Sequence, residues 1–282
     1  MVVRVVAPIL DESEFFSNVI EQRKKGYNKA YFESISKGWL ERLEAYNSYG
    51  GDPTKLSASI VKVDDKDKFI NLYSDTSKGN FHAPLIYRLR RPTPRLSLCP
   101  ACGEEGTPNT LDHYLPKDKF PEFSIHLMNL VPMCDTCQGI KLESFVDSSG
   151  QKKYLHPYFD AIAQSVMTIR IEPPFAAPTR FELIVESTLP SALAAQVTRH
   201  LIGLSLASRL EDYCQKKYSH LLKLIAFHRT HPTQDVSALL AHFIFMAEQI
   251  AINSWPAVFY RSVLANDSLL EYLRNGKLPA NL

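Results

Sequence analysis

The feature that most constrains this chain is a quartet of cysteines arranged as two Cys-x-x-Cys pairs. The pairs are Cys99 with Cys102 and Cys134 with Cys137, and 31 residues separate them. Two residues between ligands allow one tight turn to present both sulfurs, and four thiolates match the tetrahedral shell that Zn²⁺ accepts. The spacing therefore predicts a zinc site. Because four cysteine ligands leave no open coordination position, we expect this zinc to be structural.

A redox-active Cys-x-x-Cys is the alternative interpretation of each pair. Neither pair lies in the strand-then-helix context of a thioredoxin-like motif, and the chain has two such pairs. In a reducing compartment, paired cysteines are more often metal ligands than disulfides. Metal binding is therefore the favoured interpretation.

Composition limits the classes of protein to which the chain can belong. With 282 residues and 45% hydrophobic content it can bury a globular core. A net charge of +2 argues against a global polycation, so any affinity for nucleic acid must come from a local patch. No apolar run reaches the roughly 18 residues that span a bilayer, and the start of the chain is a poor signal peptide. We expect a cytoplasmic protein with no membrane contact.

One segment supplies a local basic patch. Residues 78–98 contain no acidic residue, and aromatic side chains are interleaved with five bases, which are Lys78, Arg88, Arg90, Arg91 and Arg95. A solvated charge run is the alternative interpretation. Because the segment leads directly into the cysteines, phosphate contact by these side chains is favoured.

Periodicity predicts an α+β fold that is mostly α-helical. Residues 11–46 have apolar positions at helical spacing with one break, which indicates two helices, whereas residues 64–75 fit either a helix or a strand. The stretches "VMTIRIE" and "RFELIVE" predict a β-hairpin. From Pro190 onward three to five helices are expected, one of which places Cys214 on an apolar face as a core thiol.

An Asp-His pair lies inside the cysteine quartet. Asp112 and His113 are flanked by Leu111 and Tyr114, as at the end of a strand, and Pro116 follows. An imidazole there can act as a general base, and the neighbouring carboxylate can hold a hard divalent cation. The alternative is a hydrogen-bonded strand-end pair in an inert zinc module.

The ordered set "DHYLPK", "NLVPMC", "CDTCQGIK" and "YLHPYFD" resembles the zinc-stapled HNH endonucleases of the ββα-metal fold. The resemblance covers about residues 97–160. It implies a central ββα-metal nuclease core stapled by the four-cysteine zinc, with helical regions on both sides. The expected division is an N-terminal helical region (1–80), the HNH core (81–160), and a β-hairpin followed by a C-terminal helical region (161–282).

The resemblance assigns catalytic roles to three residues of these motifs. His113 would be the general base that deprotonates water, and Asp112 would be a ligand of a catalytic Mg²⁺ or Mn²⁺. Asn129 would brace the loop and orient His113. The expected products are a 5′-phosphate and a 3′-hydroxyl.

Three further positions follow from the same resemblance. The family usually has Asn or His where this chain has Gln138, which offers the same carbonyl oxygen on a longer stem. Lys141 would touch phosphate, with a solvated helix lysine as the alternative. His156 would complete the metal or phosphate site, with a structural histidine as the alternative.

The leading hypothesis is a metal-dependent HNH endonuclease acting on DNA, with RNA as the other candidate substrate. The alternative hypothesis is a zinc-clamped nucleic-acid- or protein-binding module whose nuclease site has decayed at Gln138. By analogy, HNH proteins of similar layout serve in bacterial anti-phage systems, including Septu-like and retron-associated ones. That analogy suggests an ABC- or SMC-like ATPase as the partner.

Overall fold

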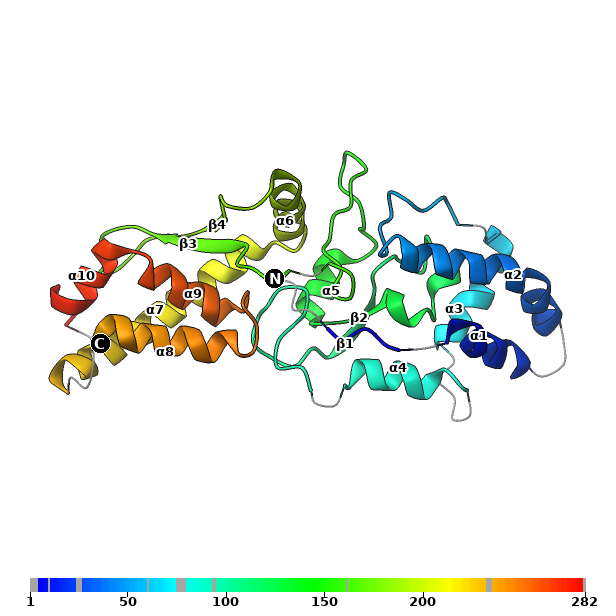
Figure 1. The fold of residues 1–282 in the computed structure, drawn as a ribbon, viewed down its shortest axis with the longest axis horizontal. Coiled ribbons are helices and arrows are strands. Elements are labelled where there is room, and N and C mark those ends of the chain that lie inside the picture. The colour runs from blue at the N-terminus through cyan, green and yellow to red at the C-terminus, as the bar shows by residue number, and fades with distance from the viewer. Residues whose placement is uncertain are drawn as a thin grey trace. The chain divides into compact units, whose positions relative to one another are not determined.

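Helices and two small antiparallel sheets make up the computed structural model, which describes residues 5–9, 11–23, 27–59, 61–74, 80–92, 95–160, 162–231 and 235–280. Within these residues the fold is α+β and mostly helical, as the sequence predicts (Figure 1). The chain divides into two units. The N-terminal unit comprises Arg4–Ala101 and Gly106–Ala161, and the C-terminal unit comprises Met1–Val3, Cys102–Glu105 and Ile162–Leu282.

Helices precede the cysteines in the N-terminal unit. They are α1 (Glu12–Glu21), α2 (Tyr27–Ser48), the 3₁₀ turn η1 (Val63–Asp65), α3 (Lys66–Ser74) and α4 (Ala83–Arg90). The first two confirm the prediction of two helices before residue 46. The segment that fitted either a helix or a strand is helical. Helix α4 lies within the basic segment, where the sequence analysis predicted no helix.

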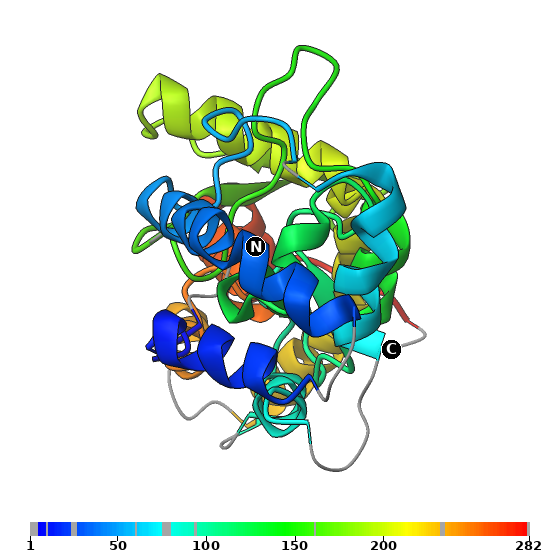
Figure 2. The same ribbon diagram turned by 90° about the vertical axis from the view of Figure 1, so that its right-hand side faces the viewer.

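An aromatic cluster holds these helices together. Phe16 of α1 meets Trp39 of α2 with ring centroids 4.6 Å apart, and Trp39 meets Phe69 of α3 at 5.1 Å. In Figures 1 and 2, α1 lies between α2 and α4. The Phe15 ring of α1 lies 5.9 Å from the ring of Phe81, just before α4. Phe15, Phe16, Trp39 and Phe69 are buried, so apolar burial is the main force that assembles this part of the unit.

Two strands and a short helix follow the first cysteine pair. Strand β1 (Thr110–His113) is antiparallel to β2 (Leu130–Met133), and α5 (Asp135–Lys141) begins two residues after β2. Their register places His113 opposite Leu130 and Asp112 opposite Val131. Residues 114–129 form the loop between the strands, which contains the 3₁₀ turns η2 (Pro121–Phe123) and η3 (Leu127–Asn129).

The C-terminal unit contains the predicted β-hairpin and a set of helices. Strands β3 (Met167–Ile171) and β4 (Phe181–Val185) pair in antiparallel fashion, which confirms that prediction. The helices are α6 (Ser191–Gly203), α7 (Leu206–Thr230), α8 (Val236–Glu248), α9 (Trp255–Leu264) and α10 (Asp267–Asn275). Helix α9 packs on β3 and α7 packs on β4 (Figure 1). Cys214 is fully buried on α7, as expected of a core thiol.

None of the helices in the described ranges combines the length and the apolar character needed to cross a membrane.

Candidate functional site

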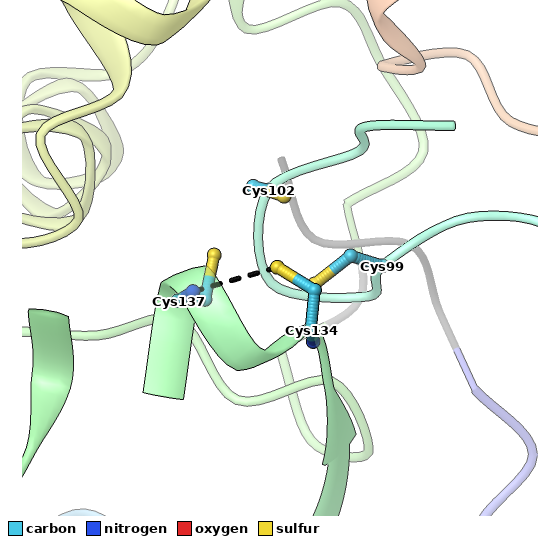
Figure 3. A group of neighbouring side chains, drawn as sticks. All are labelled: Cys99, Cys102, Cys134 and Cys137. Carbon is cyan, nitrogen blue, oxygen red and sulfur yellow. Dashed lines mark hydrogen bonds between the residues drawn. The ribbon is translucent and has the colours of Figure 1, made fainter. Parts of the chain in front are cut away.

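The four predicted cysteines converge on one point. Their sulfur atoms all lie within 4.8 Å of one another, so the cluster can hold a metal ion such as zinc. Figure 3 shows one pair on the loop that precedes β1 and the other pair at the start of α5. Cys134 is the N-cap residue of α5 and Cys137 lies in its first turn. The convergence of the two pairs, which the spacing predicted, is therefore confirmed.

Backbone amides point at two of the sulfurs. The amide of Cys134 donates to Cys99 Sγ at 3.3 Å, and the amide of Cys137 donates to Cys134 Sγ at 3.4 Å, the contact drawn as a dashed line in Figure 3. Hydrogen bonds of this kind stabilise a negatively charged sulfur and help to orient a metal ligand. The local backbone is thus arranged to favour the thiolate form that a metal binds.

Side chains of the C-terminal unit surround Cys102. Trp255 Nε1 donates to the Cys102 carbonyl at 2.7 Å, and the Trp255 amide donates to the Gly103 carbonyl at 3.1 Å. Arg209 Nη2 lies 3.7 Å from Cys102 Sγ, is ion-paired with Glu104, and its guanidinium covers the Trp255 ring at 5.5 Å. Sequence spacing does not predict either partner, because both follow Cys102 by more than a hundred residues.

The ring of His113 is oriented by a backbone carbonyl. Its Nε2 lies 2.9 Å from the Ser124 oxygen, and because a carbonyl can only accept, Nε2 carries the proton. The lone pair is therefore on Nδ1. Burial lowers the pKa of His113 to about 4, and the positive charges of Lys117 and Lys141 act in the same direction. The ring is thus neutral at physiological pH, which a general base requires.

An aromatic side chain from α3 covers this imidazole. The Tyr73 ring lies edge-on to His113 with centroids 4.5 Å apart, and the Lys117 ammonium is 5.3 Å from the Tyr73 centroid. Arg90 of α4 donates to the Tyr73 hydroxyl at 3.3 Å. Arg90 of the basic segment is thereby linked to His113 through the Tyr73 side chain. No sequence pattern pointed to Tyr73.

Asn129 is fully buried and cross-links the loop between β1 and β2. Its Oδ1 accepts from the Leu115 amide at 2.7 Å, and its Nδ2 donates to the carbonyls of Leu115 at 3.0 Å and Phe123 at 3.2 Å. Phe123 directly precedes Ser124, whose carbonyl holds His113. Asn129 therefore braces the backbone one residue before the carbonyl that orients the imidazole.

Asp112 of β1 is buried and forms an ion pair with the buried Lys141. Lys141 Nζ is 2.8 Å from Asp112 Oδ2 and donates to the His113 carbonyl at 2.9 Å. Burial raises the pKa of Asp112, while the Lys141 charge and a hydrogen bond with Gln138 oppose the rise. The Lys141 side chain is only 1% exposed. This burial excludes the surface phosphate contact that the resemblance implied for Lys141.

Gln138 is the side chain of α5 nearest to that carboxylate. It interacts with Asp112, and its Nε2 lies 3.5 Å from the Leu111 carbonyl. The structure thus brings together the two oxygen-bearing side chains that were expected to hold a divalent cation. Rotation of the amide would present its oxygen instead of its nitrogen.

Both ring nitrogens of His156 are engaged within the N-terminal unit. Nδ1 accepts from the Tyr158 amide at 3.1 Å, so Nε2 carries the proton and donates to the Tyr46 hydroxyl at 3.0 Å. That hydroxyl donates in turn to Asn129 Oδ1 at 3.1 Å. Burial lowers the pKa of His156 well below its usual value. No nitrogen is left for a metal, so His156 supports Asn129 rather than completing a metal site.

The predicted basic segment is exposed where the structure describes it. Arg88, Arg90, Arg91 and Arg95 are all exposed, and Lys78 lies outside the described residues. Three of these arginines line a pocket of about 240 Å³ that ends at the residues before β1, and Arg88 does not line it.

Comparison with known proteins gives one partial relative. The chain is 45% identical over 64 residues to Protein ea31 of Escherichia phage lambda, a match that covers 22% of this chain and 21% of that protein. The match therefore spans about a fifth of that relative's own length. No family model matches the chain, and no solved structure matches it.

Proposed function

We propose that this protein is a metal-dependent HNH endonuclease that hydrolyses phosphodiester bonds of DNA. The observation that carries the proposal is the orientation of His113. The proton on Nε2 is committed to the Ser124 carbonyl, which leaves a neutral ring with its lone pair on Nδ1. His113 is the last residue of β1, which pairs with β2, and the short helix α5 follows β2. The residue before it, Asp112, carries a buried carboxylate.

In the proposed reaction His113 acts as the general base. Nδ1 accepts a proton from a water molecule while the water oxygen forms a bond to phosphorus and the bond from phosphorus to the 3′ oxygen breaks. The departing 3′ oxygen takes a proton from solvent, so the products are a 5′-phosphate and a 3′-hydroxyl. The Ser124 carbonyl stabilises the charged ring, and Asn129 holds the carbonyl of the preceding residue, Phe123.

Asp112 and Gln138 would hold the catalytic Mg²⁺ or Mn²⁺. A carboxylate and an amide are oxygen donors that suit a hard divalent cation, and the two side chains are in contact. When bound, such an ion supplies positive charge to the scissile phosphate and to the leaving oxygen. Lys141 is ion-paired with Oδ2 of Asp112 and would keep that carboxylate oriented.

We assign the four-cysteine cluster to a structural Zn²⁺. Four sulfur ligands fill a tetrahedral shell and leave no position for water or substrate. The cluster includes the N-cap of α5, so an ion there would hold the helix that carries Gln138. In this proposal zinc positions the site and takes no part in the chemistry.

The substrate and the partner belong to the same proposal. Exposed arginines beside β1 support a nucleic-acid substrate. The assignment of DNA rather than RNA, and of an anti-phage role with an ABC- or SMC-like ATPase, rests on the family resemblance. Incubation with DNA and RNA of the same sequence, with and without a candidate ATPase encoded beside this protein, tests both assignments.

The decisive experiment is a plasmid-cleavage assay with zinc-loaded protein in Mg²⁺, in Mn²⁺ and without added divalent ion. We expect metal-dependent nicking that is lost in His113→Ala and retained in His220→Ala, whose imidazole is exposed on α7. Zinc content and circular dichroism confirm that both variants are folded. Cleavage by His113→Ala at the parent rate would refute the assignment of the base.

A second candidate function is a zinc-clamped nucleic-acid-binding module without nuclease activity. The observation that favours it is the ion pair between Lys141 and Asp112, because the carboxylate already has a cationic partner. This candidate predicts salt-sensitive binding without cleavage in any divalent ion. The Gln138→Asn variant discriminates between the two candidate functions. Restoring the family's residue should raise cleavage only if the rest of the nuclease site is functional.

A further inference from the structure

Three arginines line one pocket in the N-terminal unit. The pocket has a volume of about 240 Å³, and its walls are formed by the end of α4, the residues after it, and the residues before β1. Its lining residues include Arg90, Arg91, Arg95, Thr107 and Asn109. Guanidinium groups offer several N–H donors in a planar arrangement that suits phosphate oxygens.

Among the described residues, no acidic side chain lines this pocket. Within the described part of the chain, Arg90, Arg91 and Arg95 form no salt bridge with any carboxylate, whereas Arg42, Arg170, Arg209, Arg261 and Arg274 each form one. Three like charges that converge without a counterion repel one another, and a bound anion would relieve that repulsion. The pocket therefore has the charge that a phosphate group requires.

An exposed aromatic ring adjoins the pocket. Tyr87 of α4 is 57% exposed, and the Arg91 guanidinium lies over its ring at 5.5 Å from the centroid. Arg91 therefore contributes both to the pocket and to the aromatic surface. A base can stack on an exposed ring only when it is not already stacked inside a duplex, so this arrangement suits a single strand.

The pocket is linked to the proposed reacting centre. Arg90 lines the pocket and donates to the Tyr73 hydroxyl, and the Tyr73 ring packs against His113. Asn109 at the pocket directly precedes β1 and is four residues from His113, a separation of ~13 Å in extended backbone. A single bound nucleic-acid strand is therefore long enough to contact both the pocket and His113.

We propose that α4 and this pocket bind a single-stranded segment of nucleic acid, with a backbone phosphate among the arginines and a base on Tyr87. Its relation to cleavage rests on the proposed function, because the pocket would deliver the strand to His113. The binding itself does not depend on catalysis. A backbone phosphodiester and a terminal phosphate share the chemistry that the arginines recognise.

Binding is measured by fluorescence anisotropy with zinc-loaded full-length protein and no added divalent ion. The probes are fluorescein-labelled oligothymidylate, the same oligonucleotide with a 5′-phosphate, oligouridylate, and a duplex of equal length. Tyr87→Ala should weaken binding of the single strands roughly tenfold, whereas Tyr87→Phe keeps the ring and should bind like the parent. Arg91→Gln and Arg95→Gln should each reduce the slope of log affinity against log salt by about 0.7.

Matched control variants are Tyr49→Ala, which removes another exposed ring, and Arg180→Gln, which removes an arginine already paired with Glu182. Both should bind like the parent. Tighter binding of the 5′-phosphorylated probe that is lost in Arg95→Gln would identify a strand end as the occupant, and equal binding of the two probes would identify the backbone.

Equal binding of duplex and single strand with no effect of Tyr87→Ala would overturn the inference. If plasmid is nicked while all pocket variants bind like the parent, the pocket assignment fails and the nuclease proposal stands. If nothing is cleaved while the pocket variants lose binding, the nuclease proposal fails and the pocket assignment stands.

Discussion

The Lys141 ammonium lies 2.8 Å from Asp112 Oδ2 and 2.9 Å from the carbonyl of His113. One buried side chain of α5 thus holds the two neighbouring residues of β1 that the proposed chemistry needs. Each charge is nearly excluded from solvent, at 1% exposure for Lys141 and 7% for Asp112. Because two buried opposite charges compensate one another, removing either leaves the other unpaired in the protein interior.

Lys141→Met should lower the free energy of unfolding by about 3–5 kcal/mol, because it leaves the buried Asp112 carboxylate without a partner. The double variant Lys141→Met with Asp112→Asn should recover a large part of that loss. Urea denaturation followed by circular dichroism at saturating zinc measures both, with the exposed Lys119→Met as control. Equal stability of Lys141→Met and Lys119→Met would show that the pair contributes nothing.

Zinc content should depend on the quartet and not on the fifth cysteine. The purified protein should carry one zinc per chain, and Cys137→Ser should lose it together with much of the folded structure, because binding free energy at such a site is folding free energy. Cys214→Ala should keep the zinc, since Cys214 is buried on α7 away from the cluster. Elemental analysis and native mass spectrometry give the stoichiometry, and an equal loss of zinc in both variants would contradict the assignment.

Arg209 should tune the affinity for zinc. Its guanidinium lies 3.7 Å from Cys102 Sγ, where it offsets the negative charge of the thiolates. Arg209→Met should weaken zinc binding by about 10-fold or more, while Arg209→Lys should retain part of the effect. Competition with a chromophoric chelator measures the change, and Arg180→Met serves as a control on the same unit. An unchanged zinc affinity in Arg209→Met would show that Arg209 packs against Trp255 without affecting zinc binding.

Asn129→Ala should release the ring of His113. It removes the donor to the Phe123 carbonyl and leaves the Leu115 amide unsatisfied, at about 1–3 kcal/mol for each buried group. In the parent, ¹⁵N NMR should show the His113 proton on Nε2, and in Asn129→Ala the two tautomers should become mixed. Asn129→Asp keeps the acceptor for Leu115 and should be intermediate. A single Nε2–H tautomer in Asn129→Ala would show that Asn129 does not position His113.

Local patterns in the sequence predicted several elements correctly. The two helices before residue 46, the hairpin of β3 and β4 and the buried Cys214 all follow from periodicities that act within a few residues. Helix α4 was not predicted because it spans little more than two turns and its apolar residues show no clear helical spacing. Pro84 lies in its first turn and Pro92 follows its C-cap, so the helix has only eight residues, too few for periodicity to be informative.

The roles predicted for Lys141 and His156 do not agree with the structure, for a different reason. Sequence places a lysine on a helix and a histidine before a proline, but it does not say which distant groups will meet them. Lys141 meets a strand 28 residues earlier, and His156 meets Tyr46 of α2 across 110 residues. Their exposure and their available atoms follow from those contacts, which form only when the helices pack.

By itself, the sequence determined that there would be two short cysteine turns, because two intervening residues leave the backbone few ways to present a pair of sulfurs. It also predicted that the turns would converge, because four thiolates complete one tetrahedral zinc shell. It also predicted Asp112 and His113 as site residues, and the family resemblance added Asn129. Only the tertiary structure decided that Ser124 orients His113, that Lys141 is buried against Asp112, and that three arginines share one pocket. Those relationships join segments far apart in the chain, and burial and packing, rather than local spacing, select them.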